Sequence, residues 1–188
     1  MDFVILLVVL GIVVLAAVFV VALYNGLVQR RLRVDEAWSQ IDVQLKRRHD
    51  LIPNLVNAVR GYMEFEEETL TRVTQARADA VAAGARGPAD QAQAENQLPQ
   101  TLRSLFAVME NYPDLKANQN VLSLQEELTT TENQISFSRQ HYNATVRDYN
   151  TAIATVPAVF IAGMFGFSKR EFFEAEEGAR EVPEVRLR

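Results

Sequence analysis

The fold is decided by the apolar stretch FVILLVVLGIVVLAAVFVVAL at residues 3–23, which holds no charge, no Pro and a single Gly. As an α-helix this stretch is about 31 Å long, which matches the hydrocarbon thickness of a bilayer. A helix in the core of a small soluble protein is rarely apolar on every face. A cleaved signal peptide has a basic segment and a shorter apolar core, whereas Asp2 is the only charged side chain ahead of this stretch. We therefore predict a retained transmembrane anchor over residues 1–24.

The charges that follow the anchor predict its orientation. Arg30, Arg31 and Arg33 come first, and a second basic group follows at residues 46–48. Since an excess of Lys and Arg stays on the cytoplasmic side, the N-terminus should face outward and the rest of the chain should lie in the cytoplasm. Tyr24 lies at the junction, where an amphipathic ring suits the headgroup layer.

Composition limits the function classes. The chain has 188 residues, a formal net charge of -5 and no cysteine. The length after the anchor suits one domain, which we place at residues 25–157. The mildly acidic charge argues against nucleic acid as a partner. Without cysteine the chain has no disulfides, thiol chemistry, iron–sulfur clusters or usual structural zinc sites.

Apolar residues after the anchor recur at helical spacing, and no stretch alternates with a period of two. Their intervals of three, four and seven residues describe a narrow seam of the coiled-coil type. We therefore predict an all-α fold, in which an antiparallel up-and-down helical bundle follows the anchor. The seam residues expected to be largely buried are Trp38, Leu45, Leu128, Ile135, Tyr142 and Tyr149.

Pro53 decides how many helices the bundle contains. Proline in a helix interior removes a hydrogen bond and clashes with the preceding turn, whereas in the first turn it is tolerated. Asp50 can cap a new helix whose first turn contains Pro53, so we expect a turn between Arg48 and Pro53 and four helices. The apolar seam keeps its phase across Pro53, so the alternative is one long kinked helix and a bundle of three helices.

Gly and Pro predict the remaining boundaries. The stretch AAGARGPADQ at residues 82–91 is the clearest loop. A helix should follow at about residues 89–111, with Pro99 marking the start of its packed part. NYPD at residues 111–114 predicts a turn. The last long helix should run from about residue 116 or 120 to Val156, where Pro157 ends or kinks it.

Three stretches carry a resemblance to a known family. They are YNGLVQRRLRVDEAWSQIDVQLKRRHDLIPNLVNAVRGY at residues 24–62, YPDLKANQN at 112–120 and LQEELTTTENQISFSRQHYNATVRDYN at 124–150. In this order they resemble the LemA family of bacterial membrane proteins, and the resemblance covers residues 24–167. It implies a single N-terminal transmembrane helix in the inner membrane, a cytoplasmic antiparallel four-helix bundle and no established enzyme activity. One branch of the family is associated with magnetosome membranes.

Residues that could carry catalysis are few. A di-metal site in a helical bundle needs inward carboxylates and Glu-x-x-His motifs, and neither His49 nor His141 lies in one. The sequence has no Gly-x-Ser-x-Gly motif and no Gly-rich phosphate loop. We therefore predict no catalytic, cofactor-binding or metal-binding residues, and place His49 at a helix end and His141 on a bundle face. The acidic residues within 64–68, and Glu126, Glu127 and Glu132, are interpreted as solvated helix faces.

Residues 158–188 form a last segment that is first apolar and then charged. Its apolar part, together with Pro157, is too short to span a bilayer. Because the last helix of an up-and-down bundle returns toward the anchor, this segment should reach the membrane interface; the alternative is that it closes the end of the bundle. The membrane-interface candidates are Tyr24, Arg30, Arg31, Arg33, Phe160, Phe165, Phe167, Lys169 and Arg170.

These features favour a non-enzymatic, membrane-anchored scaffold or adaptor. Its expected partners are the lipid bilayer and either further copies of the chain or other membrane proteins, and shaping of the bilayer is a role open to it. The alternative is a regulatory or substrate-presenting subunit of a membrane protease or of an envelope-sensing system. An enzyme of unrecognised type ranks last, since no catalytic constellation is visible.

Overall fold

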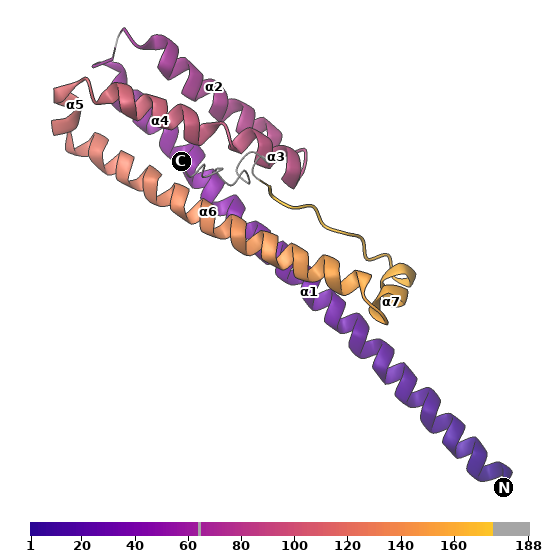
Figure 1. The fold of residues 1–188 in the computed structure, drawn as a ribbon. Coiled ribbons are helices and arrows are strands. Elements are labelled where there is room, and N and C mark those ends of the chain that lie inside the picture. The colour runs from indigo at the N-terminus through magenta and orange to yellow at the C-terminus, as the bar shows by residue number, and fades with distance from the viewer. Residues whose placement is uncertain (64, 175–188) are drawn as a thin grey trace, which may run out of the picture. The chain divides into compact units, whose positions relative to one another are not determined.

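The computed structural model describes residues 1–63 and 65–174, so the charged tail from residue 175 onward and Glu64 of the acidic run lie outside it. The described residues contain no strand, which confirms the all-α fold class. Their helices are α1 (Asp2–Arg60), α2 (Glu67–Ala83), α3 (Pro88–Glu95), α4 (Leu98–Met109), α5 (Pro113–Ala117), α6 (Gln119–Ala154) and α7 (Ala158–Met164) (Figure 1).

The chain divides into two compact units. The first unit contains residues 1–39 and 141–170, which hold the apolar run, the end of α6 and all of α7. The second unit contains residues 40–140 and the segment that begins at Glu171. Helices α2 to α5 therefore lie wholly in the second unit, while α1 and α6 contribute to both.

Helix α1 is continuous through Pro53, so the turn predicted between Arg48 and Pro53 is wrong. Proline has no N–H to donate to the backbone carbonyl four residues earlier, which is that of His49. Arg77 of α2 supplies the missing donor, because its Nε lies 2.6 Å from the His49 carbonyl oxygen. The chain turns instead between the end of α1 at Arg60 and the start of α2 at Glu67.

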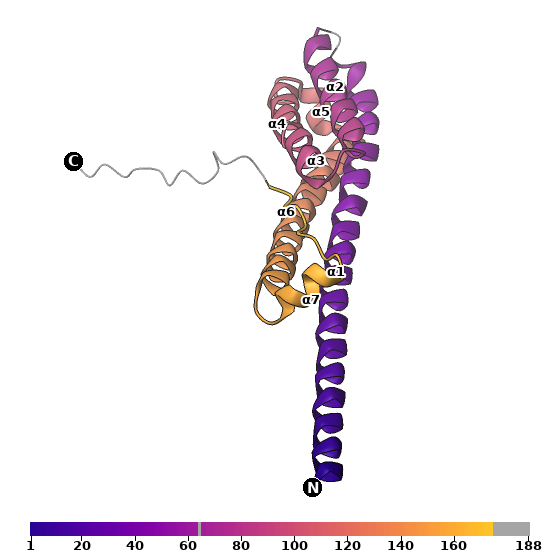
Figure 2. The ribbon, with the colours of Figure 1, turned by 90° about the vertical axis from the view of Figure 1, so that its right-hand side faces the viewer.

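The second unit is a helical bundle with one hydrophobic core. Helix α2 packs against α3 and α4, and apolar side chains of α1 and α6 join the same core (Figure 1 and Figure 2). Helices α3 and α4 together occupy the place of the predicted third helix, interrupted at residues 96 and 97. Buried members of the core include Ile52, Leu55, Val59, Val73, Leu98, Leu105, Val121 and Leu128.

In the first unit, α1 packs antiparallel against the end of α6. Arg30 pairs with Asp148, and the Trp38 and Tyr142 rings lie 5.3 Å apart, so higher residue numbers on α1 face lower ones on α6. Helix α7 follows the end of α6 and lies beside α1 in both ribbon views (Figure 1 and Figure 2). The buried apolar side chains of this unit include Leu27, Val34, Val146, Ile153, Ala158, Ile161 and Ala162.

The predicted seam is largely the buried face of these helices. Trp38 is partly buried, and α6 ends at Ala154, two residues before the predicted end at Val156. Val156 is 76% exposed, so the seam does not extend to it. The predicted core residues that are buried are Leu45, Leu128, Ile135, Tyr142 and Tyr149.

Candidate membrane-interface site

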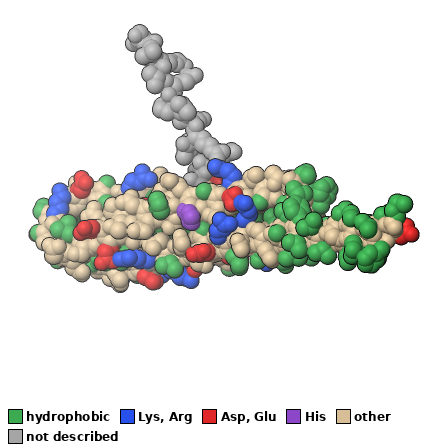
Figure 3. All heavy atoms as spheres, turned by 90° about the horizontal axis from the view of Figure 1, so that it is seen from below, with side chains coloured by type: hydrophobic (Ala, Val, Ile, Leu, Met, Phe, Trp, Pro, Cys, Tyr) green, Lys and Arg blue, Asp and Glu red, His purple; other side chains and the backbone are tan. Residues whose placement is uncertain are grey.

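The apolar run of α1 has no protein around it. Its most apolar window has a mean hydropathy of 3.5 and is 0% buried, and it is long and apolar enough to cross a membrane. A helix in the core of a soluble protein would be covered by other helices, so this exposure argues against a core helix. Figure 3 shows apolar side chains gathered along this run and next to its end.

Three aromatic rings meet where the run ends. Tyr24 follows Leu23, the last residue of the apolar stretch. The centroid of its ring lies 4.9 Å from that of Phe165 and 5.7 Å from that of Phe167, in tilted and edge-on arrangements. Both geometries are favourable for aromatic pairs. The structure thus brings three of the sequence-predicted interface residues into one cluster, which we call the Tyr24 cluster.

A glycine places the two phenylalanine rings in this cluster. Helix α7 ends at Met164, and Gly166 follows with a φ of +70°, a left-handed conformation that favours glycine. The Phe167 amide then donates to the carbonyl of Ala162 at 2.9 Å, and the Phe165 amide donates to the carbonyl of Ile161 at 3.0 Å. The Phe167–Ala162 bond across a left-handed glycine is the 6→1 bond of a Schellman-type helix ending, and the sequence Met-Phe-Gly-Phe encodes this ending locally.

Two side chains of α6 hold the segment that follows. The Tyr149 hydroxyl donates to the backbone carbonyl of Ser168 at 3.1 Å. The Asn150 amide donates to the carbonyl of Arg170 and accepts from the Arg170 amide, both at 2.9 Å. Burial raises the pKa of Tyr149, so its phenol stays protonated as a donor at neutral pH. These bonds hold residues 168–170 against the last turns of α6.

The predicted basic candidates divide into two groups. Arg30 pairs with Asp148 at 2.6 Å, and Arg170 pairs with Asp35 at 2.9 Å, so both already have carboxylate partners within the first unit. The Arg31 guanidinium lies 5.5 Å from the Phe167 ring centroid and joins the Tyr24 cluster. Sequence reasoning missed the two ion pairs because both carboxylates lie far along the chain from their partners.

The remaining candidates lie on exposed surface. Arg33 and Lys169 have no carboxylate partner within 1–63 and 65–174, the part of the chain that the structure describes. Phe160 is 69% exposed on α7. Arg31, Arg33 and Lys169 are therefore the cations of this site that internal ion pairs leave available.

The second unit contains a buried ionic cluster that sequence reasoning missed. Arg48 and Glu95 are both fully buried and form an ion pair, and the second guanidinium nitrogen of Arg48 pairs with Glu132 of α6. His49 lies within α1 rather than at a helix end, with its Nε2 2.9 Å from a Glu95 oxygen. Glu132 is thus a partner of Arg48 and not only a solvated side chain. His141, interpreted from the sequence as a hydrogen bonder on a bundle face, is exposed.

Burial and neighbouring charges within this cluster shift the pKa values of Glu95 and Arg139. Burial acts to raise the pKa of Glu95, but the contact with His49 and the charge of Arg48 outweigh it and hold that pKa below its usual value. Burial lowers the pKa of Arg139, and the like charge of Arg48 adds to this effect. One sequence signal pointed here: Arg48 continues the spacing of Ile41 and Leu45, so a charge occupies a seam position.

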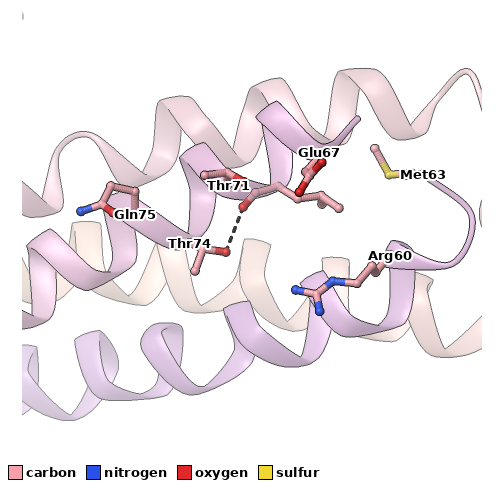
Figure 4. A pocket seen from close by; sticks show the side chains of 7 residues that line it. Arg60, Met63, Glu67, Thr71, Thr74 and Gln75 are labelled. Carbon is pink, nitrogen blue, oxygen red and sulfur yellow. Dashed lines mark hydrogen bonds between the residues drawn. The ribbon is translucent and has the colours of Figure 1, made fainter. Parts of the chain in front are cut away.

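The second unit also has an open pocket of about 560 Å³ where α1 ends and α2 begins. Figure 4 shows Arg60 on one side and Glu67, Thr71 and Thr74 on the other. The Thr74 hydroxyl donates to the Leu70 carbonyl of its own helix at 2.9 Å. The residues that line this pocket include no His and no Ser, so it holds no Ser–His pair.

Metal-binding chemistry has no visible site in the described part of the chain. Residues 1–63 and 65–174 contain no group of three or more His, Cys, Asp or Glu side chains placed to hold a metal ion.

The site that stands out is the Tyr24 cluster at the end of an exposed apolar helix. In the part of the chain that the structure describes, these features define an all-helical protein with one helix that is long and apolar enough to cross a membrane.

Comparison with known proteins identifies the family. The LemA family matches residues 37–187, and the chain belongs to this family. It is 24% identical over 184 residues to magnetosome protein MamQ of Magnetospirillum gryphiswaldense, covering 85% of this chain and 67% of that protein. It is 25% identical to magnetosome protein MamQ 2 of Paramagnetospirillum magneticum, with the same coverage. It is 27% identical over 155 residues to protein LemA of Metamycoplasma hominis, covering 81% of this chain and 69% of that protein.

Proposed function

We propose that this LemA-family chain is a non-enzymatic membrane scaffold or adaptor. Helix α1 crosses the inner membrane once with its N-terminus outside, and the helical bundle lies in the cytoplasm and binds further copies of the chain or other membrane proteins. The observation that carries the proposal is the apolar run of α1, whose most apolar window is 0% buried. So much exposed apolar surface is unfavourable in water and favourable in lipid.

Two further observations support this proposal. The arginines at positions 30, 31 and 33 follow the anchor closely, and such an excess of basic residues marks the cytoplasmic flank. Relatives of the chain are named as magnetosome proteins, which is consistent with a role at a membrane. The buried charges of the second unit are engaged in ion pairs with one another, which fits a structural role for them.

Reporter fusions test the topology. A reporter that is active only in the cytoplasm should be active when it is fused after residue 188, and a reporter that is active only outside should be silent. The opposite pattern would place the bundle outside and overturn the proposed orientation.

Crosslinking in intact membranes tests the scaffold role. Phe137 on α6 is 74% exposed, so a photocrosslinker at this position can reach a partner. A ladder of adducts between copies of the chain supports a scaffold, whereas one discrete adduct with a protease or a receptor supports a regulatory or substrate-presenting subunit. Ile135, two residues earlier on α6, is fully buried, so a crosslinker there is the matched control and should give neither product.

A further inference from the structure

We propose that α7 and the turn at residues 165–167 lie in the interfacial layer of the bilayer and form a second membrane contact beside the anchor. The contact joins the Tyr24 cluster to the exposed face of α7, and its occupant is the lipid interface itself. This proposal rests on the proposed function in one respect, which is that α1 crosses a membrane.

The Tyr24 cluster sets the depth of this contact. Tyr24 is the residue directly after the apolar run, and ring centroids of Phe165 and Phe167 lie within 5.7 Å of its own. Each residue of a helix advances by about 1.5 Å, so both phenylalanines lie within a few residues of the end of the run. If the run fills the hydrocarbon layer, these rings lie where that layer gives way to headgroups.

Helix α7 is apolar on two faces, and only one of them is covered by protein. Ala158, Ile161 and Ala162 are buried in the first unit. Phe160 is 69% exposed and Met164, one helical turn later, is 76% exposed. A short surface helix in water normally carries polar residues on its outer face. An apolar outer face at the end of a membrane-spanning run is matched by lipid.

Cations lie close to the aromatic rings of this contact. On α1, Arg31 and Arg33 follow Tyr24 in the chain, and the Arg31 guanidinium lies 5.5 Å from the centroid of the Phe167 ring; after α7, Lys169 follows Phe167 by two residues. These three cations have no carboxylate partner among the described residues, whereas Arg30 and Arg170 are paired. Cations beside such aromatic rings can contact anionic headgroups at the membrane surface.

The chain offers a direct test because it has no cysteine. Single-cysteine variants of the full chain are labelled with an environment-sensitive fluorophore and reconstituted into vesicles of neutral and anionic phospholipid. Some of these lipids carry a nitroxide quencher at a shallow or a deep position of the acyl chain. Phe160→Cys and Met164→Cys report on α7, Val14→Cys reports on the anchor, and Ser39→Cys is the exposed control. Ser39 lies about 22 Å of helix beyond Tyr24 on α1.

The expected result is a loss of emission at Phe160→Cys and Met164→Cys, larger with the shallow quencher than with the deep one. Val14→Cys should be quenched more by the deep quencher, and Ser39→Cys should keep its emission. If Val14→Cys is quenched and both α7 labels keep the emission of the control, the second contact is absent while the anchor stands. Disulfide crosslinks between copies of unlabelled Phe160→Cys or Met164→Cys, together with no quenching of the labelled variants, would show that another copy covers this face instead. If Val14→Cys itself is not quenched, the membrane-spanning role of α1 fails as well.

Discussion

The Nε of Arg77 donates a hydrogen bond to the backbone carbonyl of His49 over 2.6 Å, and this bond replaces the one that Pro53 cannot make. Proline inside a helix normally leaves the carbonyl four residues earlier without its partner. Here a side chain from α2 satisfies that carbonyl, so α1 continues from Asp2 to Arg60. The length of this helix therefore depends on an arginine 28 residues away from the carbonyl that it serves.

Removing Arg77 should destabilise the second unit in a way that depends on Pro53. We expect Arg77→Met to lower the free energy of unfolding by about 1–3 kcal/mol, because a partly buried carbonyl loses its donor. The loss should be smaller in a Pro53→Ala background, where the amide of residue 53 can bind the His49 carbonyl. Chemical unfolding of the full chain in detergent micelles, followed by its helical circular dichroism, measures both values. Arg72→Met, on the exposed side of α2, is the control, and equal losses for Arg77→Met in both backgrounds would contradict the compensation.

The buried guanidinium of Arg48 should contribute far more to the free energy of unfolding than the exposed guanidinium of Arg47. We expect Arg48→Met to cost about 3–5 kcal/mol of unfolding free energy, because it leaves the buried Glu95 carboxylate without its main cation. Arg47 pairs with Glu127 on the surface, with a shortest distance of 3.5 Å. Arg47→Met should therefore cost at most about 1 kcal/mol. Similar losses for the two variants in the same unfolding assay would show that the buried pair has no special role.

Acid should destabilise the second unit through Glu95. Its pKa in the folded chain lies below the ordinary value of 4.5, so the unfolded chain binds the proton more tightly. The stabilisation is therefore complete above pH 4.5 and is lost as the pH falls through the folded pKa. The ionisable groups around this carboxylate are Arg48 and His49 of α1 and Glu132 and Arg139 of α6.

Unfolding measured between neutral and acidic pH tests this linkage. Glu95→Gln should be less stable at neutral pH and should lose less stability than the parent chain as the pH falls below 4.5. Glu110→Gln changes an exposed carboxyl at the end of α4 and should keep the parent profile. A Glu95→Gln profile parallel to that of the parent chain would mean that Glu95 does not carry the acid sensitivity.

Truncating two nearby residues of α6 should change the free energy of unfolding by very different amounts. Ile135 is 0% exposed, so Ile135→Ala should cost about 2–5 kcal/mol through lost burial and the cavity that it leaves. Phe137 is 74% exposed, and Phe137→Ala should change the unfolding free energy by about 0.5 kcal/mol or less. Unchanged melting of Ile135→Ala would show that the buried face of α6 has been assigned incorrectly.

The sequence by itself determined the long apolar helix, the helical fold class and the family. Each of these depends on residues that are close together in the chain. The apolar run from Phe3 to Leu23 can be recognised without knowledge of its neighbours, because its length and uniform hydrophobicity are those of a helix that can cross a bilayer. The helical seam likewise follows from local spacing, and Gly166 marks the end of α7 through its own backbone conformation.

Only the tertiary structure decided whether α1 breaks at Pro53 and which charges remain free. The answer at Pro53 depends on a donor from α2, and the burial of Arg48 depends on Glu95 and Glu132, which lie 47 and 84 residues further along the chain. The same is true of two of the predicted interface candidates, because Arg30 pairs with Asp148 and Arg170 pairs with Asp35. A local pattern shows that a residue has a polar group or a charge to satisfy. The partner that satisfies it comes from a distant helix, so it is decided only when the chain has folded.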